Sequence, residues 1–296
     1  MSSTAALQSL ALAGRRPRRW RLPPGQVRRL VTYAILTAVG VVWVYPFLWM
    51  MSAAVKSNIE IFSGLGLIPQ HWRWENFVYA WEGADIGGYF LNTVVVSVSG
   101  VMIVLVTTSM MGYVLGRYSF PGKRLVIGLL GLLVFLPQGY TIIPIFDLIT
   151  KLGLSGSLLG IILAESGSAH IIMILLFAGY FRQLPNELEE SALVDGAGFL
   201  RIFLRIMLPL SKPVIATSII LQFIASWNDF LIPLVLTLSQ PRLRTLAVGV
   251  YSFQGENLTD WADMAAASTI AVIPVVIVFL FLQRYFIEGL AGAVKQ

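Results

Sequence analysis

Long apolar runs dominate this sequence and restrict what the chain can fold into. Six runs are each near the ~20 residues that an α-helix needs to cross a membrane, and none shows the ~10-residue alternation of a membrane β-barrel. They cover 31–55, 89–115, 125–145, 158–181, 214–236 and 264–285. Only 12% of the residues are charged and 57% are hydrophobic, which is too little polar surface for a soluble protein. The sequence predicts an all-α integral membrane protein with six transmembrane helices.

Lysine and arginine are distributed unevenly between the segments that join these runs. If the N-terminus is cytoplasmic, most of the 21 lysines and arginines lie in cytoplasmic segments. The exceptions are Lys56, Arg73, Lys151, Arg242 and Arg244. Because positively charged loops stay in the cytoplasm, we expect both termini and the segment 182–213 to be cytoplasmic. The expected order is a basic tail (1–30), a first helix (31–55), an external loop (56–88), a membrane core (89–285) and a cytoplasmic tail (286–296).

Composition and motifs exclude several function classes. The net charge of +6 arises from this uneven distribution, so we expect contact with membrane lipid and no nucleic-acid binding. The chain has no cysteine, which excludes disulfides, thiol nucleophiles and thiolate-bound metals. It has no phosphate-binding Gly-x-x-x-x-Gly-Lys-Ser/Thr loop, and its two histidines form no zinc-hydrolase motif. We therefore expect no catalytic residue, no metal site and no cofactor in this chain.

The segment 182–213 carries the strongest local signal. Pro185 suits the first position of a helix, and the glutamates that follow fall where the helix dipole favours negative charge. Residues 195–198 predict a turn. Apolar residues then recur at helical spacing at Phe199, Ile202, Phe203 and Ile206. This pattern predicts a helix, a turn and a second helix at the membrane surface.

Small side chains in this segment would let the backbone of another protein approach closely, and the acidic residues would complement a basic cleft. The alternative is an amphipathic hairpin that lies in the membrane interface without a partner. If a partner binds, the expected contact residues are Glu189, Glu190, Ser191, Ala192, Asp195, Gly196 and Ala197.

The spacing in this segment resembles a known signature. Glu190, Ser191 and Ala192 are followed after three residues by Gly196, and after nine more by Ile-Met-Leu-Pro (206–209). This resembles the cytoplasmic coupling loop of ABC importer permeases, with serine at position 191 where the family usually has alanine. The resemblance implies a type I ABC importer permease fold whose coupling helix docks into a cleft of an ATPase subunit.

Other segments resemble the carbohydrate-uptake class of these permeases. They are Trp-Arg-Trp-Glu-Asn-Phe (72–77), Tyr-Phe-Leu-Asn-Thr (89–93), Tyr-Ser-Phe-Pro-Gly (118–122), Ser-Trp-Asn-Asp-Phe (226–230) and the ending 283–295. The ending is similar to the tail of the maltose-type second permease subunit, which in that family reaches into the ATPase dimer. The resemblance makes Gly289, Gly292 and Lys295 the expected contacts. Gln296 differs from the family's glycine, and the tail is one residue short between Leu290 and Gly292.

The resemblance also implies a function and partners. It implies a non-catalytic permease subunit in a bacterial plasma (inner) membrane, which forms half the translocation pathway of an importer for a di- or oligosaccharide. Glycerol phosphate or another small metabolite is the alternative substrate. The implied partners are a second homologous permease, two ATPase subunits that bind ATP and Mg, and an extracytoplasmic substrate-binding protein, which would face the segments 56–88 and 239–263.

Polar side chains within the predicted helices are candidates for the translocation path, because ionisable groups at membrane depth are costly and usually functional. The candidates are Asn92, Glu165, His170, Asn228 and Asp229. Each has an alternative: a helix cap for Asn92, a hydrogen bond between Glu165 and His170, and bonds to a neighbouring helix for the last two. A proton-coupled secondary transporter could use Glu165, His170 and Asp229 as a relay, but the sequence shows no inverted repeat of the kind common in such transporters.

Overall fold

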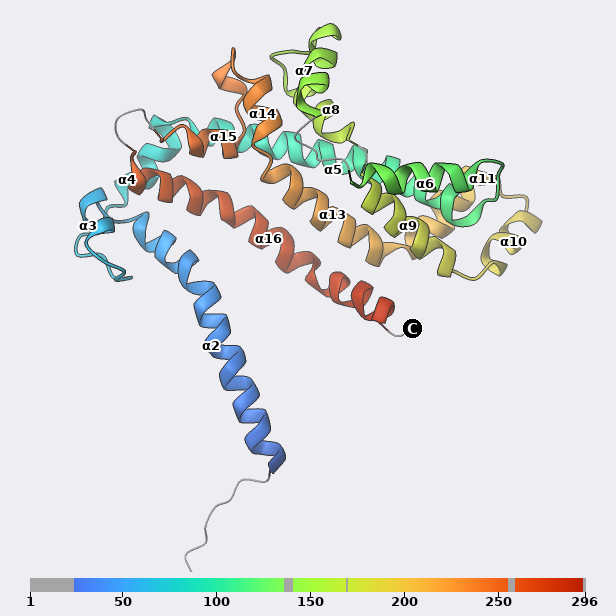
Figure 1. Ribbon diagram of the computed structural model, residues 1–296, viewed down its shortest axis with the longest axis horizontal. Helices are drawn as coiled ribbons and strands as arrows, with labels where there is room; N and C mark the ends of the chain where they lie inside the picture. Colours follow the sequence, from blue (N-terminus) through green and yellow to red (C-terminus); the bar gives the residue numbers. More distant parts are fainter. Residues whose placement is uncertain (1–23, 136–140, 169, 255–258, 295–296) are drawn as a thin grey trace, which may run out of the picture. The chain divides into compact units, whose positions relative to one another are not determined.

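The computed structural model describes residues 24–135, 141–168, 170–254 and 259–294, and side chains as far as Arg284. In this part of the chain the structure consists of helices joined by loops (Figure 1). The one extended pairing among these residues is an isolated bridge between Gln254 and Thr259. The predicted all-α fold class is confirmed.

Three helices of the described chain are long and apolar enough to cross a membrane by themselves. They are α2 (Pro24–Ala53), α5 (Ile86–Arg117) and α16 (Trp261–Val294). They coincide with the first, second and sixth predicted spans, which confirms that an uninterrupted apolar run locates such helices.

Two further spans are broken. Helices α8 (Leu158–Ser166) and α9 (Ile171–Gln183) are bent by 55° across a short break. The segment Phe199–Leu210 and α13 (Lys212–Trp227) are bent by 80°. If each bent pair is one span, the described residues contain five. The continuous fourth helix predicted over 158–181 is therefore wrong in detail, since it consists of two helices.

The fifth predicted span also ends early. Helix α13 ends at Trp227, and a separate short helix, α14 (Leu231–Leu236), follows. Between them Asn228 Nδ2 donates to the carbonyl oxygen of Ile224 (2.8 Å). Asp229 Oδ1 accepts from the N–H of Leu231 (3.1 Å). Polar side chains that bond nearby backbone groups compete with the helical ladder, which is why the helix stops within an apolar run.

The third predicted span extends across residues 136–140, which lie outside the described ranges. On either side of them lie α6 (Lys123–Leu133) and α7 (Ile142–Lys151). The total of six transmembrane helices therefore stays a prediction.

The chain divides into two compact units, 1–49 and 50–296. In the first unit, the part of α2 that it contains exposes large apolar side chains such as Val42 and Trp43. A helix with apolar side chains around its surface requires apolar surroundings.

Helix α5 is at the centre of the second unit, where it packs against α8, α9 and α13, while α13 packs against α16. Gly112 and Gly116 are one turn apart on α5 and face α9. A Cβ atom at Gly112 would lie 2.3 Å from Phe177 Cβ, and one at Gly116 would lie 2.8 Å from the carbonyl oxygen of Ala178. This Gly-x-x-x-Gly spacing lets the two helices approach closely.

The segment predicted to be external contains α3 (Asn58–Phe62), α4 (Glu75–Val78) and the π-helix η1 (Tyr79–Gly83). Asn58 Nδ2 donates to Asp260 Oδ1 (3.2 Å), and Asn58 Oδ1 accepts from the N–H of Ala262 (2.9 Å). Two segments that the sequence assigns to one face, 56–88 and 239–263, are thus brought into contact at the start of α16.

Candidate functional site

The acidic part of the predicted surface hairpin is a helix. Helix α10 (Glu187–Val194) begins two residues after Pro185, close to the predicted start. Its first turn contains Glu187, Glu189 and Glu190, which places negative charge at the positive end of the helix dipole. The predicted helix is confirmed.

Helix α10 ends in a glycine-dependent turn. Gly196 has a φ of +75°. The N–H of Gly196 donates to the carbonyl oxygen of Leu193 (3.0 Å), and the N–H of Ala197 donates to that of Ala192 (2.9 Å). This bond pair is a Schellman motif, in which the residue after the helix adopts the left-handed conformation that glycine tolerates best. Gly196 therefore fixes where α10 ends.

The second helix of the hairpin is built from three short pieces. They are α11 (Phe199–Ile202), the π-helix η3 (Phe203–Met207) and α12 (Leu208–Leu210). Ser211 separates α12 from α13 and is fully buried. Tyr180 of α9 donates to the carbonyl oxygen of Leu210 (2.9 Å). The hairpin thus joins α9 to α13, and its end at Leu210 is hydrogen-bonded to α9.

The inner face of the hairpin packs on the membrane helices. Tyr113 lies at the centre, with ring centroids 5.5 Å from Phe181 and 5.3 Å from both Phe199 and Phe203. Of the four apolar residues at helical spacing, Ile202 and Phe203 are buried, Ile206 is half-buried and Phe199 is 38% exposed. The buried cluster consists of Tyr113, Phe177, Phe181, Ala192, Ile202, Phe203, Met207 and Val214. Since these residues come from α5, α9, α13 and the hairpin, the hairpin belongs to the same core as the helices.

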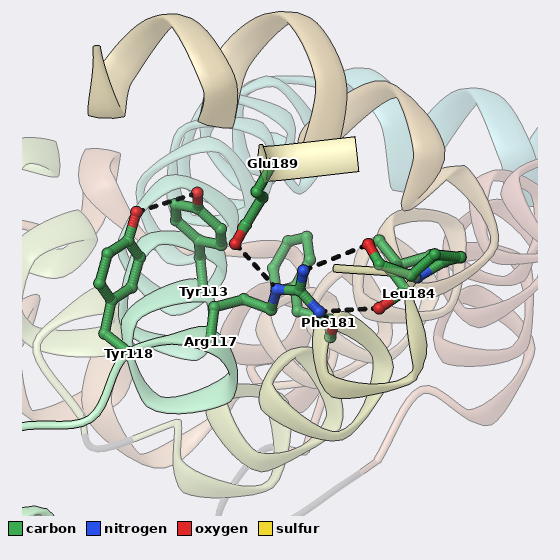
Figure 2. Close-up of polar contacts among 7 residues, drawn as sticks. Tyr113, Arg117, Tyr118, Phe181, Leu184 and Glu189 are labelled. Atoms are coloured by element: carbon green, nitrogen blue, oxygen red, sulfur yellow. Dashed lines mark hydrogen bonds and ion pairs between the residues drawn. The ribbon is translucent and has the colours of Figure 1, made fainter. Parts of the chain in front are cut away.

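Arg117, the last residue of α5, is the polar centre of this region (Figure 2). Its side chain is 4% exposed. Arg117 Nε lies 3.2 Å from Glu189 Oε2. Nη1 donates to the carbonyl oxygens of Phe181 (3.4 Å) and Leu184 (2.7 Å), and Nη2 to that of Pro185 (3.3 Å). The guanidinium therefore binds carbonyls in the last turn of α9 and in the two residues that follow it, where helical carbonyls lack intrahelical partners.

Sequence reasoning missed this role, because Arg117 enters it only as one positive charge in a cytoplasmic segment. The available signal is an arginine in the last turn of an apolar helix together with an acidic helix elsewhere in the chain.

The predicted contact residues divide into two groups. Glu190, Ser191, Asp195 and Gly196 are exposed. Glu189 pairs with Arg117, Ala197 is half-buried, and Ala192 is 6% exposed within the apolar cluster. The methyl group of Ala192 thus contacts its own chain, and the expectation that another protein approaches closely here stays a prediction.

The hairpin also exposes large apolar side chains. They are Leu193, Val194, Leu200 and Leu204. Val194, next to Asp195, is 88% exposed. An exposed apolar side chain next to an acidic one, as at Val194 and Asp195, suits a surface that binds another protein.

Comparison with known proteins identifies the family. Residues 26–291 match the family described as "Binding-protein-dependent transport system inner membrane component". The chain belongs to this family.

Two relatives and one solved structure show how far the similarity extends. The permease is 35% identical over 267 residues to the diacetylchitobiose uptake system permease protein NgcG of Streptomyces coelicolor, covering 90% of this chain and 87% of that one. It is 31% identical over 252 residues to the melibiose/raffinose/stachyose import permease protein MelC of Bacillus subtilis, covering 84% and 91%. A crystal structure of a bacterial ABC transporter involved in the import of the acidic polysaccharide alginate has the same fold, with a TM-score of 0.75 at 22% identity, covering 90% of this chain and 99% of that one. The predicted membership in the carbohydrate-uptake class of ABC importer permeases is confirmed.

Within the membrane core of the permease, Glu165 does not bond His170 through its carboxylate. Glu165 is 6% exposed, and its Oε2 accepts from Ser226 Oγ of α13 (2.5 Å). Glu165 Oε1, Ser166 Oγ and His170 Nε2 are buried without a hydrogen-bond partner among the described residues. A Cβ atom at Gly100 of α5 would lie 3.6 Å from Ser166 Oγ. An interhelical hydrogen bond is therefore present, but its partner is a serine on α13.

The other path candidates bond backbone groups. Asn92 lies inside α5, so it is not a helix cap, and its Nδ2 donates to the carbonyl oxygens of Arg242 (2.8 Å) and Arg244 (3.0 Å). Asn228 is exposed and Asp229 is half-buried, and both bond their own segment rather than a neighbouring helix.

The tail candidates of the permease lie at its C-terminal end. Gly289 and Gly292 are in the last turns of α16. Lys295 lies outside the described residues.

Proposed function

We propose that the permease forms half of the translocation pathway of an ATP-driven importer for a di- or oligosaccharide. NgcG is named as a permease for uptake of diacetylchitobiose, and MelC as one for import of melibiose, raffinose and stachyose. Relatives that share 31–35% of their residues with this chain over most of its length support the same substrate class.

The energy for transport comes from other subunits in this proposal. The sequence has no phosphate-binding loop, so ATP and Mg are bound by two ATPase subunits beneath the permease. A second, homologous permease completes the pathway, and an extracytoplasmic binding protein delivers the substrate. The family description, which names a binding-protein-dependent system, supports the last partner. In this proposal the termini and the hairpin are cytoplasmic, because most lysines and arginines lie in these segments and positively charged loops stay in the cytoplasm.

The observation that carries the coupling role is the two-sided packing of the hairpin. Its outer face exposes Glu190, Asp195 and Val194, whereas its inner face is part of the buried cluster with α5, α9 and α13. A subunit that binds the outer face and changes shape on ATP hydrolysis would therefore displace three membrane helices together. In alternating access the pathway opens to one side of the membrane and then to the other. A segment that transmits this movement must contact both the ATPase and the membrane helices, as the two faces of the hairpin allow.

The first experiment is purification of the tagged permease from its own membrane in mild detergent, followed by identification of the proteins that accompany it. We expect an ATPase and a second permease, and uptake of labelled oligosaccharide by the reconstituted assembly. A chain that purifies alone, under conditions that preserve known importer complexes, would contradict the proposal. Uptake of glycerol phosphate but of no sugar would contradict the substrate class alone.

Substitution of Gly196 tests the coupling role. Leucine is strained at a φ of +75°, so Gly196→Leu should abolish uptake while the chain remains inserted. Gly196→Asn is the matched control, because asparagine tolerates the left-handed conformation and nothing lies within 4 Å of a Cβ atom at this position. We expect the asparagine variant to retain much more uptake. Wild-type uptake by Gly196→Leu would overturn the coupling assignment.

A further inference from the structure

Two adjacent glutamates of α10 have different environments. Glu189 lies against Arg117, with 17% of its side chain exposed. Glu190 is exposed to solvent. Successive residues of an α-helix point about 100° apart, so neighbouring acids of the same type can serve different surfaces. Glu189 is available to its own chain and Glu190 to a partner.

Arg117 of α5 contacts two other helices through one planar group. It belongs to α5, donates to carbonyls at the end of α9, and pairs with Glu189 of α10. The fixed fork of a guanidinium allows several simultaneous bonds in different directions, which the single ammonium of a lysine does not reproduce. In Figure 2 the side chains of Arg117 and Glu189 point toward one another beside the ring of Tyr113.

The surroundings of Arg117 make this contact rigid. One residue earlier, Gly116 brings α5 into close contact with the backbone of α9 at Ala178. The Tyr113 ring, which is fully buried, packs between α5 and the hairpin. A charged hydrogen bond in such a place is little screened by solvent. The joint between α5, α9 and α10 therefore resists relative motion of the three helices.

We propose that Arg117 is a positioning residue that fixes α10 to α5 and α9, so that a displacement of the outer face of α10 moves both membrane helices. The inference rests on the proposed coupling function and goes beyond it, because it separates two consecutive roles. Glu190 belongs to the surface that docks the ATPase, and Glu189 with Arg117 belongs to the joint that transmits the displacement. Loosening the joint should leave docking intact and lower the yield of transport per ATP.

The functional test compares Glu189→Ala with Glu190→Ala in the complete importer, reconstituted with its partners. For Glu189→Ala we expect wild-type recovery of the ATPase and at least a five-fold loss of sugar imported per ATP hydrolysed. Glu189→Gln, which keeps a hydrogen-bond acceptor but no charge, should be intermediate, and Arg117→Lys should resemble Glu189→Ala. For Glu190→Ala we expect reduced recovery of the ATPase. A wild-type transport yield in both Glu189→Ala and Arg117→Lys would overturn the proposal.

A spectroscopic test does not depend on transport. Since the chain has no cysteine, spin labels can be attached to cysteines introduced at two exposed serines, Ser119 after α5 and Ser191 on α10. We expect a narrow distribution of label distances in the otherwise wild-type permease and in Glu190→Ala, and a broad one in Glu189→Ala. A narrow distribution in Glu189→Ala would contradict the joint even if the ATPase binds as proposed. Failure of the wild-type chain to bind an ATPase would contradict the coupling function but leave this distance measurement decisive for the joint.

Discussion

Arg117 and Glu165 are both buried ionisable side chains, but the fold surrounds them differently. Arg117 has a carboxylate and three carbonyl oxygens as partners. Glu165 has one serine hydroxyl, and its Oε1 and the neighbouring Ser166 Oγ have no partner among the described residues. Glu189 Oε1 in the Arg117 network is also buried without a partner among the described residues, so the two regions differ in the number of contacts and not in whether every group is paired. A buried network with more hydrogen bonds is more rigid, whereas unpaired buried groups are costly and favour rearrangement or hydration. We therefore expect the region around Arg117 to hold its contacts more firmly than the region around Glu165.

The largest difference in stability between the two regions is expected when each charged side chain is replaced by leucine. Arg117→Leu leaves Glu189 without its cation, and loss of one partner of a buried ion pair typically costs about 3–5 kcal/mol. Glu165→Leu leaves only the Ser226 hydroxyl without its acceptor, so we expect a much smaller loss. The measurement is the thermal unfolding midpoint of each variant in the same detergent. Equal losses would show that Glu165 is as firmly integrated as Arg117.

The same glycine-to-alanine substitution can be made in both regions of α5. At Gly112 a Cβ atom would lie 2.3 Å from Phe177 Cβ, while at Gly100 its nearest neighbours are serine hydroxyls at 3.6 and 3.8 Å. Overpacking a well-packed contact typically costs about 1–3 kcal/mol, so Gly112→Ala should lower the unfolding midpoint. Gly100→Ala should leave it unchanged or raise it, because alanine favours the helix by about 1 kcal/mol over glycine. A loss at both positions would indicate that the Glu165 region is packed as tightly as the joint.

The smallest difference is expected from replacing each glutamate with glutamine. Glu189→Gln removes the charge that balances Arg117 and should lower the unfolding midpoint. Glu165→Gln keeps a hydrogen-bond acceptor for Ser226 and is less costly to bury than a carboxylate, so the midpoint should stay the same or rise slightly. If Glu165→Gln lowered the unfolding midpoint and Glu189→Gln did not, the charge of Glu165 would contribute more to stability than that of Glu189.

The sequence predicts well those elements whose position is determined by residues close together in the chain. The apolar runs locate α2, α5 and α16, Pro185 marks the start of α10, and Gly196 marks its end. The spacing of Ile202 and Phe203 predicts their burial correctly. Each of these depends on a periodicity or a backbone preference that a few neighbouring residues determine.

What the sequence does not predict depends on partners distant along the chain. The bonds of Arg117 go to main-chain carbonyls 64–68 residues away, and a carbonyl carries no residue-type signal. Glu165 bonds a serine 61 residues away, one of several in the chain. The end of α13 at Trp227 escapes a hydropathy argument because the apolar run continues through it. By contrast, the spacing of Gly112 and Gly116 is a recognisable signal for close helix contact that sequence reasoning can use.

The chain bends by 80° at Ser211, between the second half of the hairpin and α13, so a rotation of the hairpin about this bend also moves the far end of α13. The segment before the bend is Phe199–Leu210, and the segment after it is α13, Lys212–Trp227. At about 1.5 Å per residue they are roughly 18 and 24 Å long. If the two segments rotate as one rigid body, a rotation of about 5° about Ser211 moves the far end of α13 by roughly 2 Å on these helix lengths. At that end Trp227 Nε1 donates to the carbonyl oxygen of Ala271 on α16 (3.0 Å). A shift of that size exceeds what one hydrogen bond tolerates, so a small tilt of the hairpin is enough to break the contact between α13 and α16 at Trp227.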